Sequence, residues 1–249
     1  MITVDHPAQV QLYKNMIWQL EKDGHTVKIA ACVKEVMIDL LDAYGFDYSI
    51  LFENTMGSMP HKLMMAARGE IEIIKLAKKF RPDIFFSATS EIVGPVSRIF
   101  RKPNIGITDT EHANLSNMFA YPATDVILTP SSFKNDLGKK QVRFEGCKEL
   151  AYLHPKHFTP DPSVLDDLKL SENDNIFMVR FAAFTAGHDV KSQKFSSKYI
   201  PELISRLKKE GEIVISSEVS LDDSLKKYQY NISPAKYHDL LAYSKLYVG

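Results

Sequence analysis

The sequence is poor in cysteine, in net charge and in long apolar runs. Its two cysteines, Cys32 and Cys147, lie far apart and neither belongs to a CxxC pair, so we expect them to pack as small apolar residues. The 31 Lys and Arg residues balance 31 Asp and Glu residues, and no basic block stands out, which disfavours nucleic acid as a partner. No apolar run approaches the roughly 20 residues that cross a bilayer, and no signal segment precedes the first expected strand, so the sequence predicts a cytoplasmic protein without a membrane span.

Several catalytic motifs are absent as well. The GxSxG sequence of many hydrolases, the P-loop and the GxGxxG dinucleotide fingerprint do not occur, and those classes then lack their nucleophile or phosphate-binding geometry. His6, Asp109, Glu111 and His112 carry metal-ligand atoms without an HxxxH or HxH spacing, so we expect no metal.

What the chain does contain is an alternation of short apolar runs with helical patterns, which predicts an α/β fold. The composition, 45% apolar and 25% charged over 249 residues, is that of a globular chain, long enough for one large or two modest domains. The first six expected strands are residues 2–4, 27–31, 48–52, 84–86, 105–108 and 126–129. Their order with the intervening helices indicates a parallel, doubly wound sheet, which we assign to a Rossmann-like domain at residues 1–155.

A second alternation follows a segment rich in proline. Residues 149–170 contain Pro155, Pro160 and Pro162, too many for a helix interior or a central strand, and we expect an ordered linker there. Further strands are expected at 176–179, 212–215 and 246–248, with helices at 199–209, 221–228 and 237–243. Because the sequence ends at Gly249 directly after an expected strand, we expect a second Rossmann-like domain, residues 156–249, that is truncated at its carboxyl end.

Polar side chains follow the expected strands of the first domain. Asp109, Glu111, His112 and Asn114 come directly after residues 105–108, and an open α/β sheet binds its ligands beyond the carboxyl ends of its strands. Capping of the next helix by Asp109, Thr110 or Asn114 is the alternative, although a cap needs one such residue and not a cluster.

Two other strand ends carry candidate residues. His6 follows the first strand, where the free N–H groups of a helix start would face a ligand, and a structural bond to a neighbouring carbonyl is an equal alternative. Ser90, after the fourth strand, donates to an acceptor hydroxyl or caps the next helix.

Two Rossmann-like units in succession suggest the GT-B architecture, and longer blocks of sequence make the resemblance more specific. These blocks are DHPAQVQLYKNMIWQLEKDGHTVKIAA, DTEHAN, KELAYLHPKHFTPDP, VRFAAFTAGHD, ISSE and ISPAKYHDLLAYSKLYVG. Together they resemble a family of archaeal and bacterial proteins catalogued as a domain of unknown function. That family is usually described as predicted glycosyltransferases and is distantly similar to UDP-N-acetylglucosamine 2-epimerase. Its members continue beyond the segment matching 246–249 into a Gly-rich turn and a Glu-bearing helix, which are absent from this sequence.

The resemblance implies that a nucleotide-activated sugar, a UDP-sugar, binds in an interdomain cleft with an unknown acceptor. No cofactor is expected, and a homo-oligomer is left open. On the acceptor side the implied base belongs to the set Glu111, Asp109, His112 and His6, with Ser90 and Asn114 beside it. On the nucleotide side Arg180 offers a forked fit to phosphate oxygens. The remaining implied nucleotide contacts are His188, Glu218, Ile232 and Pro234, and an Arg180–Glu218 ion pair is the structural alternative.

Two other functions stay open. In the epimerases the strand end that matches residues 88–90 resembles Gly-Asp-Thr, and Ala88-Thr89-Ser90 lacks the acidic residue of that pattern. Epimerisation needs a group that handles a proton at a sugar carbon. The missing acid therefore weakens the interpretation of this chain as an isomerase. A non-catalytic sugar-nucleotide-binding or assembly protein is the third possibility, favoured by the expected truncation.

Overall fold

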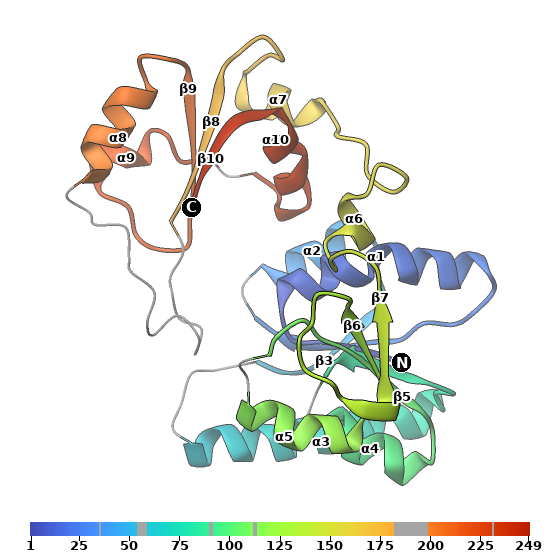
Figure 1. Cartoon of the computed structure of the whole chain (residues 1–249). Helices are drawn as coiled ribbons and strands as arrows, with labels where there is room; N and C mark the ends of the chain where they lie inside the picture. The colour runs from blue at the N-terminus through green and yellow to red at the C-terminus, as the bar shows by residue number, and fades with distance from the viewer. Residues whose placement is uncertain (35, 54–58, 90–91, 112–113, 182–198, 231) are drawn as a thin grey trace. The chain divides into compact units, whose positions relative to one another are not determined.

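The computed structural model describes residues 1–34, 36–53, 59–89, 92–111, 114–181, 199–230 and 232–249. The chain divides into two compact units, Met1–Phe158 and Thr159–Gly249, and each is built around its own parallel sheet (Figure 1). The domain boundary expected after residue 155 lies near this division and stays a prediction. In the described part of the chain, no helix combines the length and the apolar composition that a membrane span requires.

The first unit contains a seven-stranded sheet in the order β3-β2-β1-β4-β5-β6-β7, in which every neighbouring pair is parallel. The strands are β1 Ile2–Val4, β2 Ile29–Val33, β3 Tyr48–Glu53, β4 Phe85–Ala88, β5 Asn104–Ile107, β6 Val126–Pro130 and β7 Gln141–Phe144. The six expected strands are present with slightly shifted ends. β7 was not expected, because it is an edge strand with partly exposed side chains and therefore carries no apolar run.

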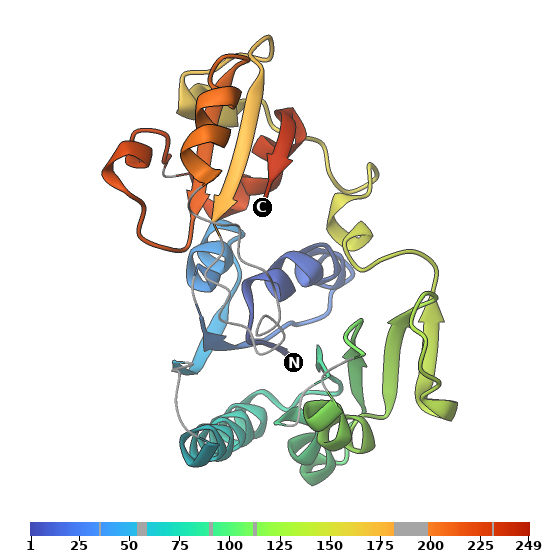
Figure 2. The ribbon, with the colours of Figure 1, turned by 60° about the vertical axis from the view of Figure 1, so that its left-hand side comes forward.

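Helices cover both faces of this sheet. They are α1 Pro7–Lys22, α2 Met37–Ala43, α3 Met59–Phe80, α4 Val93–Phe100, α5 Asn114–Ala123 and α6 Leu150–Leu153, with the 3₁₀ turn η1 Gly138–Lys140 before β7. Two views show α1 and α2 on one face and α3, α4 and α5 on the other (Figures 1 and 2). Apolar residues at helical spacing fill the layer between, such as Ile73 and Ala77 of α3 against Phe85 of β4.

The second unit contains a three-stranded parallel sheet in the order β10-β8-β9. Its strands are β8 Ile176–Phe181, β9 Glu212–Ser217 and β10 Ser244–Val248; its helices are α7 Ser163–Leu168, α8 Ile200–Leu207, α9 Asp223–Lys226, the 3₁₀ turn η4 Pro234–Lys236 and α10 Tyr237–Tyr243. Strand residues alternate between the two faces: Val214 packs with α7 and α10, whereas Ile213 and Ile215 pack with α8 and α9.

The expected linker at 149–170 is partly wrong, because α6 and α7 both lie inside it. Val164, Leu165 and Leu168 of α7 are buried against Ile176 and Leu240. The proline that argued against a helix, Pro162, stands at the N-cap of α7, where a missing N–H has no intrahelical partner to lose.

Candidate functional site

The carboxyl ends of β1, β4 and β5 lie next to one another in the first sheet. β1 pairs with β4, and β4 pairs with β5, all in parallel. The residues that follow these strands therefore extend from one edge of the sheet, which is the edge where open α/β sheets bind ligands.

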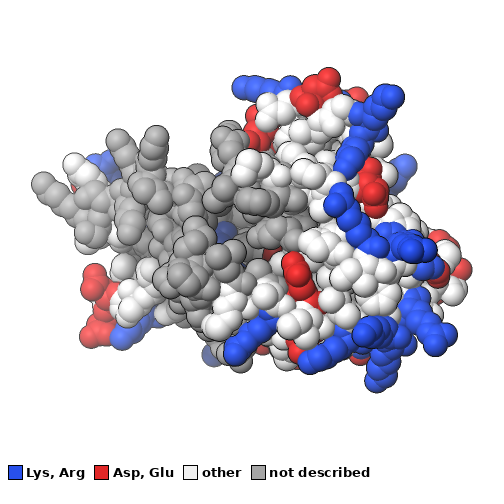
Figure 3. Space-filling model, turned by 90° about the horizontal axis from the view of Figure 1, so that it is seen from below, with Lys and Arg blue, Asp and Glu red and all other residues white. Residues whose placement is uncertain are grey.

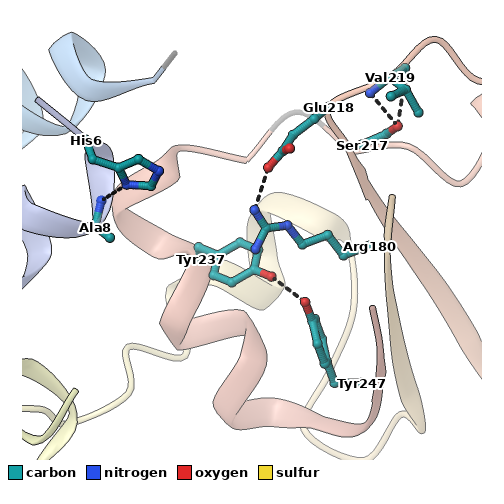
Figure 4. Close-up of polar contacts among 8 residues, drawn as sticks. All are labelled: His6, Ala8, Arg180, Ser217, Glu218, Val219, Tyr237 and Tyr247. Atoms are coloured by element: carbon teal, nitrogen blue, oxygen red, sulfur yellow. Dashed lines mark hydrogen bonds and ion pairs between the residues drawn. The ribbon is translucent and has the colours of Figure 1, made fainter. Parts of the chain in front are cut away.

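His6 follows β1 and caps helix α1. Its Nδ1 accepts a hydrogen bond from the Ala8 backbone N–H at 3.1 Å (Figure 4), and the side chain is exposed. Because Nδ1 accepts, the proton of a neutral ring is on Nε2. His6 therefore accepts a hydrogen bond from a backbone N–H group, whereas the structural role considered from the sequence was a hydrogen bond to a backbone carbonyl.

Asp109 and Glu111, which follow β5, are both held by lysines of distant segments. Asp109 Oδ2 lies 2.7 Å from Lys148 Nζ, and the two side chains are 34% and 33% exposed. Glu111 accepts a hydrogen bond from the Lys134 backbone N–H. A carboxylate offers about four acceptor positions, so each group retains capacity for a substrate hydroxyl. Lys148 and Lys134 were not among the expected site residues.

Tyr121 of α5 belongs to the same neighbourhood. Burial raises the pKa of its phenol, the Thr108 hydroxyl opposes this effect, and the negative charge of Glu111 adds to it. The phenol therefore stays protonated at neutral pH. The sequence offered no signal for Tyr121, since it stands in an ordinary helical pattern.

Several predicted site residues cannot be placed. Ser90, His112 and His188 lie outside the described residues, and Asn114 is described only as the first residue of α5. Their predicted roles stay predictions.

The carboxyl edge of the second sheet carries a polar cluster formed by Arg180, Glu218, Tyr237 and Tyr247, which we call the Arg180 cluster. Arg180 Nη2 donates to Glu218 Oε1 at 2.5 Å, and the Arg180 side chain is 40% exposed. The guanidinium carbon lies 6.0 Å from the centroid of the Tyr237 ring, and the Tyr237 hydroxyl donates to that of Tyr247 at 3.5 Å (Figure 4). The Arg180–Glu218 ion pair considered from the sequence is therefore present.

Electrostatics keep the guanidinium of the Arg180 cluster charged. Burial lowers the pKa of the Arg180 guanidinium, but the hydrogen bond and charge of Glu218, with the oxygens of Tyr237 and Tyr247, raise that pKa above its ordinary value. Burial, followed by the bond to Tyr247, raises the pKa of the Tyr237 phenol. A guanidinium beside neutral phenol donors has the chemistry to bind an anion such as a phosphate, and the carboxylate of Glu218 can accept hydrogen bonds from hydroxyls.

Two further predicted contacts, Ile232 and Pro234, lie before α10. The Ile232 side chain packs against the core of the second unit and is partly buried. Pro234 opens η4, where the Lys236 N–H donates to the Ser233 carbonyl at 2.9 Å. Tyr237 and Tyr247 were missed from the sequence because aromatic residues in a helix and a strand are typical of a core.

Among the described residues, no three His, Cys, Asp or Glu side chains gather in a way that could hold a metal ion. The expected lack of a metal and of a cofactor stays a prediction.

A family model described as a protein of unknown function (DUF354) matches residues 1–242. The chain belongs to the DUF354 family. This DUF354 chain is 20% identical to an uncharacterised protein of Methanocaldococcus jannaschii over 219 residues, which is 84% of this chain and 62% of that relative. It thus spans less than two thirds of the relative's length.

The DUF354 chain also resembles solved structures of UDP-GlcNAc 2-epimerases and of a forosaminyltransferase. UDP-GlcNAc 2-epimerase from Neisseria meningitidis bound to UDP-GlcNAc matches with a TM-score of 0.66 at 13% identity, over 99% of this chain and 76% of that one. The UDP-GlcNAc 2-epimerase of M. jannaschii matches with a TM-score of 0.61 at 12% identity, over 99% of this chain and 77% of that chain. Spinosyn forosaminyltransferase SpnP matches with a TM-score of 0.61 at 12% identity, over 99% of this chain and 73% of that chain. The likeness shows the GT-B fold, and it confirms both the predicted fold class and the resemblance noted in the sequence.

Proposed function

We propose that this DUF354 chain binds a UDP-sugar and transfers its glycosyl group to an acceptor hydroxyl. The observation that carries the proposal is the Arg180 cluster. In it a permanently charged guanidinium, partly exposed, lies between a carboxylate and a phenol. A guanidinium fork fits the oxygens of a diphosphate, and the Glu218 carboxylate accepts hydrogen bonds from ribose hydroxyls.

The first unit supplies the acceptor half in this proposal. Glu111, with Asp109 next to it, takes the proton of the acceptor hydroxyl as that oxygen forms a bond to the sugar carbon. The bond from that carbon to the phosphate oxygen breaks, and UDP departs with a negative charge that Arg180 stabilises.

The other predicted residues keep their predicted sides. His6, His112, Ser90 and Asn114 belong to the acceptor half, and His188, Ile232 and Pro234 to the nucleotide half. The interdomain cleft expected from the sequence stays a prediction. The N. meningitidis epimerase bound to UDP-GlcNAc, together with the S. aureus MnaA structure containing UDP, supports a uridine nucleotide as the ligand class.

A second candidate is epimerisation of a UDP-sugar at carbon 2, which the likeness to two 2-epimerases favours. It needs a group that handles a proton at the sugar carbon. Residues Ala88 and Thr89 at the end of β4 supply no carboxylate, so we rank transfer first. A binding or assembly protein without catalysis ranks third.

Calorimetry and NMR with the same protein distinguish these functions. We expect heat of binding with UDP and UDP-GlcNAc but not with ADP, and release of UDP from the sugar nucleotide without an isomerised sugar. Isomerised sugar in the NMR spectrum would establish the epimerase instead. Binding without either product would leave the non-catalytic role, and no heat with any nucleotide would end the proposal.

A further inference from the structure

The amino edge of the first sheet carries a concentration of positive charge. Parallel strands start at the same edge, so the turns that precede β4, β5 and β7 lie along it. Six cations in or next to these turns define what we call the amino-edge face: Arg81, Arg98, Arg101, Lys102, Lys139 and Lys140. Seen from below, Lys and Arg side chains predominate over Asp and Glu side chains on the right-hand side of the view (Figure 3).

Printed contacts tie these turns together. Arg98 Nη2 and Lys140 Nζ both donate to the Pro122 carbonyl at the end of α5, at 2.5 and 3.0 Å. Lys102 Nζ lies 2.9 Å from Asp83 Oδ1, which joins the turn after α4 to the turn after α3. The carboxylates on this face are Asp83, paired with Lys102, Asp125, which accepts from the Asn104 N–H at 2.9 Å, and Asp136, which accepts from the Gly138 N–H at 2.8 Å. The cations therefore outnumber the anions on a chain whose formal net charge is zero.

Helix dipoles explain part of this charge and leave the rest. Cations are favoured near the carboxyl ends of helices, and Arg98 and Lys140 serve α5 in that way. Arg81 and Arg101 also stand at carboxyl ends, directly after α3 and at the C-cap of α4. Their side chains and that of Lys139 are nevertheless exposed and therefore available to an external anion.

Large apolar side chains are exposed beside the same turns. Ile99 in the last turn of α4 is 62% exposed, and Ile84 directly before β4 is 47% exposed. Isoleucine offers no aromatic plane on which a nucleic-acid base could stack. Lysine, arginine and exposed aliphatic side chains on one face are instead typical of surfaces that lie on anionic membranes.

We propose that the amino-edge face docks on the surface of a bilayer that contains anionic lipid. The cations attract the lipid phosphates and carboxylates, and Ile99 and Ile84 enter the boundary between headgroups and acyl chains. This docking does not depend on the proposed glycosyl transfer, since the face lies at the opposite edge of the sheet from Asp109 and Glu111.

Sedimentation with vesicles tests the proposal. The wild-type chain is expected to bind vesicles of phosphatidylcholine with phosphatidylserine, and not phosphatidylcholine alone. Each basic residue near an anionic surface contributes about 1 kcal/mol, roughly a fivefold factor. The variant R81E/R101E/K139E should therefore lose at least about 100-fold in binding. Raising salt from about 0.1 M to about 1 M, which shortens the screening length from about 10 to about 3 Å, should also release the protein.

Two further variants make the result specific. K209E/K227E/K245E changes three exposed lysines of the second unit by the same charge and should bind like the wild type. Ile99→Ser keeps every charge and should weaken binding by about 10-fold or more, the contribution of one large apolar side chain. Thermal unfolding checks that each variant folds.

Three results would overturn the proposal. They are failure of the wild type to bind the anionic vesicles, equal losses in the two triple variants, and full binding by Ile99→Ser. Binding of single-stranded RNA that exceeds vesicle binding and is lost in R81E/R101E/K139E would assign the face to nucleic acid instead.

Discussion

Replacement of Arg180 by alanine separates a ligand-binding role from a structural one. Arg180 and Glu218 form an ion pair with side chains that are 40% and 38% exposed, and pairs of such exposure contribute about 0–1 kcal/mol to stability. A hydrogen bond between the charged guanidinium and a bound ligand, by contrast, contributes about 1.5–3 kcal/mol to the free energy of binding. We therefore expect Arg180→Ala to weaken UDP binding about 10- to 150-fold and to lower the free energy of unfolding by no more than about 1 kcal/mol.

Calorimetry with UDP and urea denaturation measure the two effects on one preparation. The matched control is Arg206→Ala, which removes an exposed arginine whose Nη2 lies 2.6 Å from Glu202 Oε1 in the same unit. It should leave UDP affinity unchanged. Arg180→Lys keeps the charge without the forked geometry, so its affinity should fall between those of wild type and Arg180→Ala.

The reasoning fails if Arg180→Ala and Arg206→Ala bind UDP equally well. It also fails if the loss of affinity comes with a loss of unfolding free energy well above about 1 kcal/mol, because Arg180 would then act by holding the unit together.

Three other changes test the remaining assignments. Glu111→Gln should lower UDP release from a UDP-sugar by about 10²- to 10⁴-fold with unchanged UDP affinity, and full activity would remove Glu111 as the base. Gly94→Ala should destabilise the first unit by about 1–3 kcal/mol in urea denaturation, because its Cβ would lie 2.2 Å from the Ala123 Cβ and 3.0 Å from the Ala123 carbonyl oxygen; an unchanged midpoint would contradict this packing. Burial, with the charge of Asp5, raises the pKa of the Cys32 thiol to about 12, whereas Cys147 is exposed. Iodoacetamide at pH 8, read by mass spectrometry, should label Cys147 alone, and equal labelling of both would refute the burial of Cys32.

The Cys32 shift also has a consequence for stability. Its folded pKa of about 12 exceeds the ordinary value of 9.0, so the folded state holds this proton more tightly above pH 9. The part of the free energy of unfolding that depends on the protonated Cys32 thiol is therefore fully present below about pH 9. It is lost as the pH rises toward about 12.

The sequence by itself determined the fold class and the positions of the strand ends at which the proposed site residues lie. Strands of parallel sheets are buried on both faces and read as apolar runs. This is why β5 and β8 were found, with Glu111 shortly after β5 and Arg180 at the end of β8. β7 escaped because an edge strand is only partly buried, and α7 escaped because its Pro162 was weighed as a breaker and not as a helix start.

Only the tertiary structure decided what each of these residues contacts. Lys148 reaches Asp109 and Glu218 reaches Arg180 from segments far along the chain, and the cations of the amino-edge face come from three separate turns. The register between paired strands determines such contacts, and the apolar pattern within one segment does not predict that register. The apolar pattern therefore specified where the chain is buried, while the pairing of strands specified which charges meet.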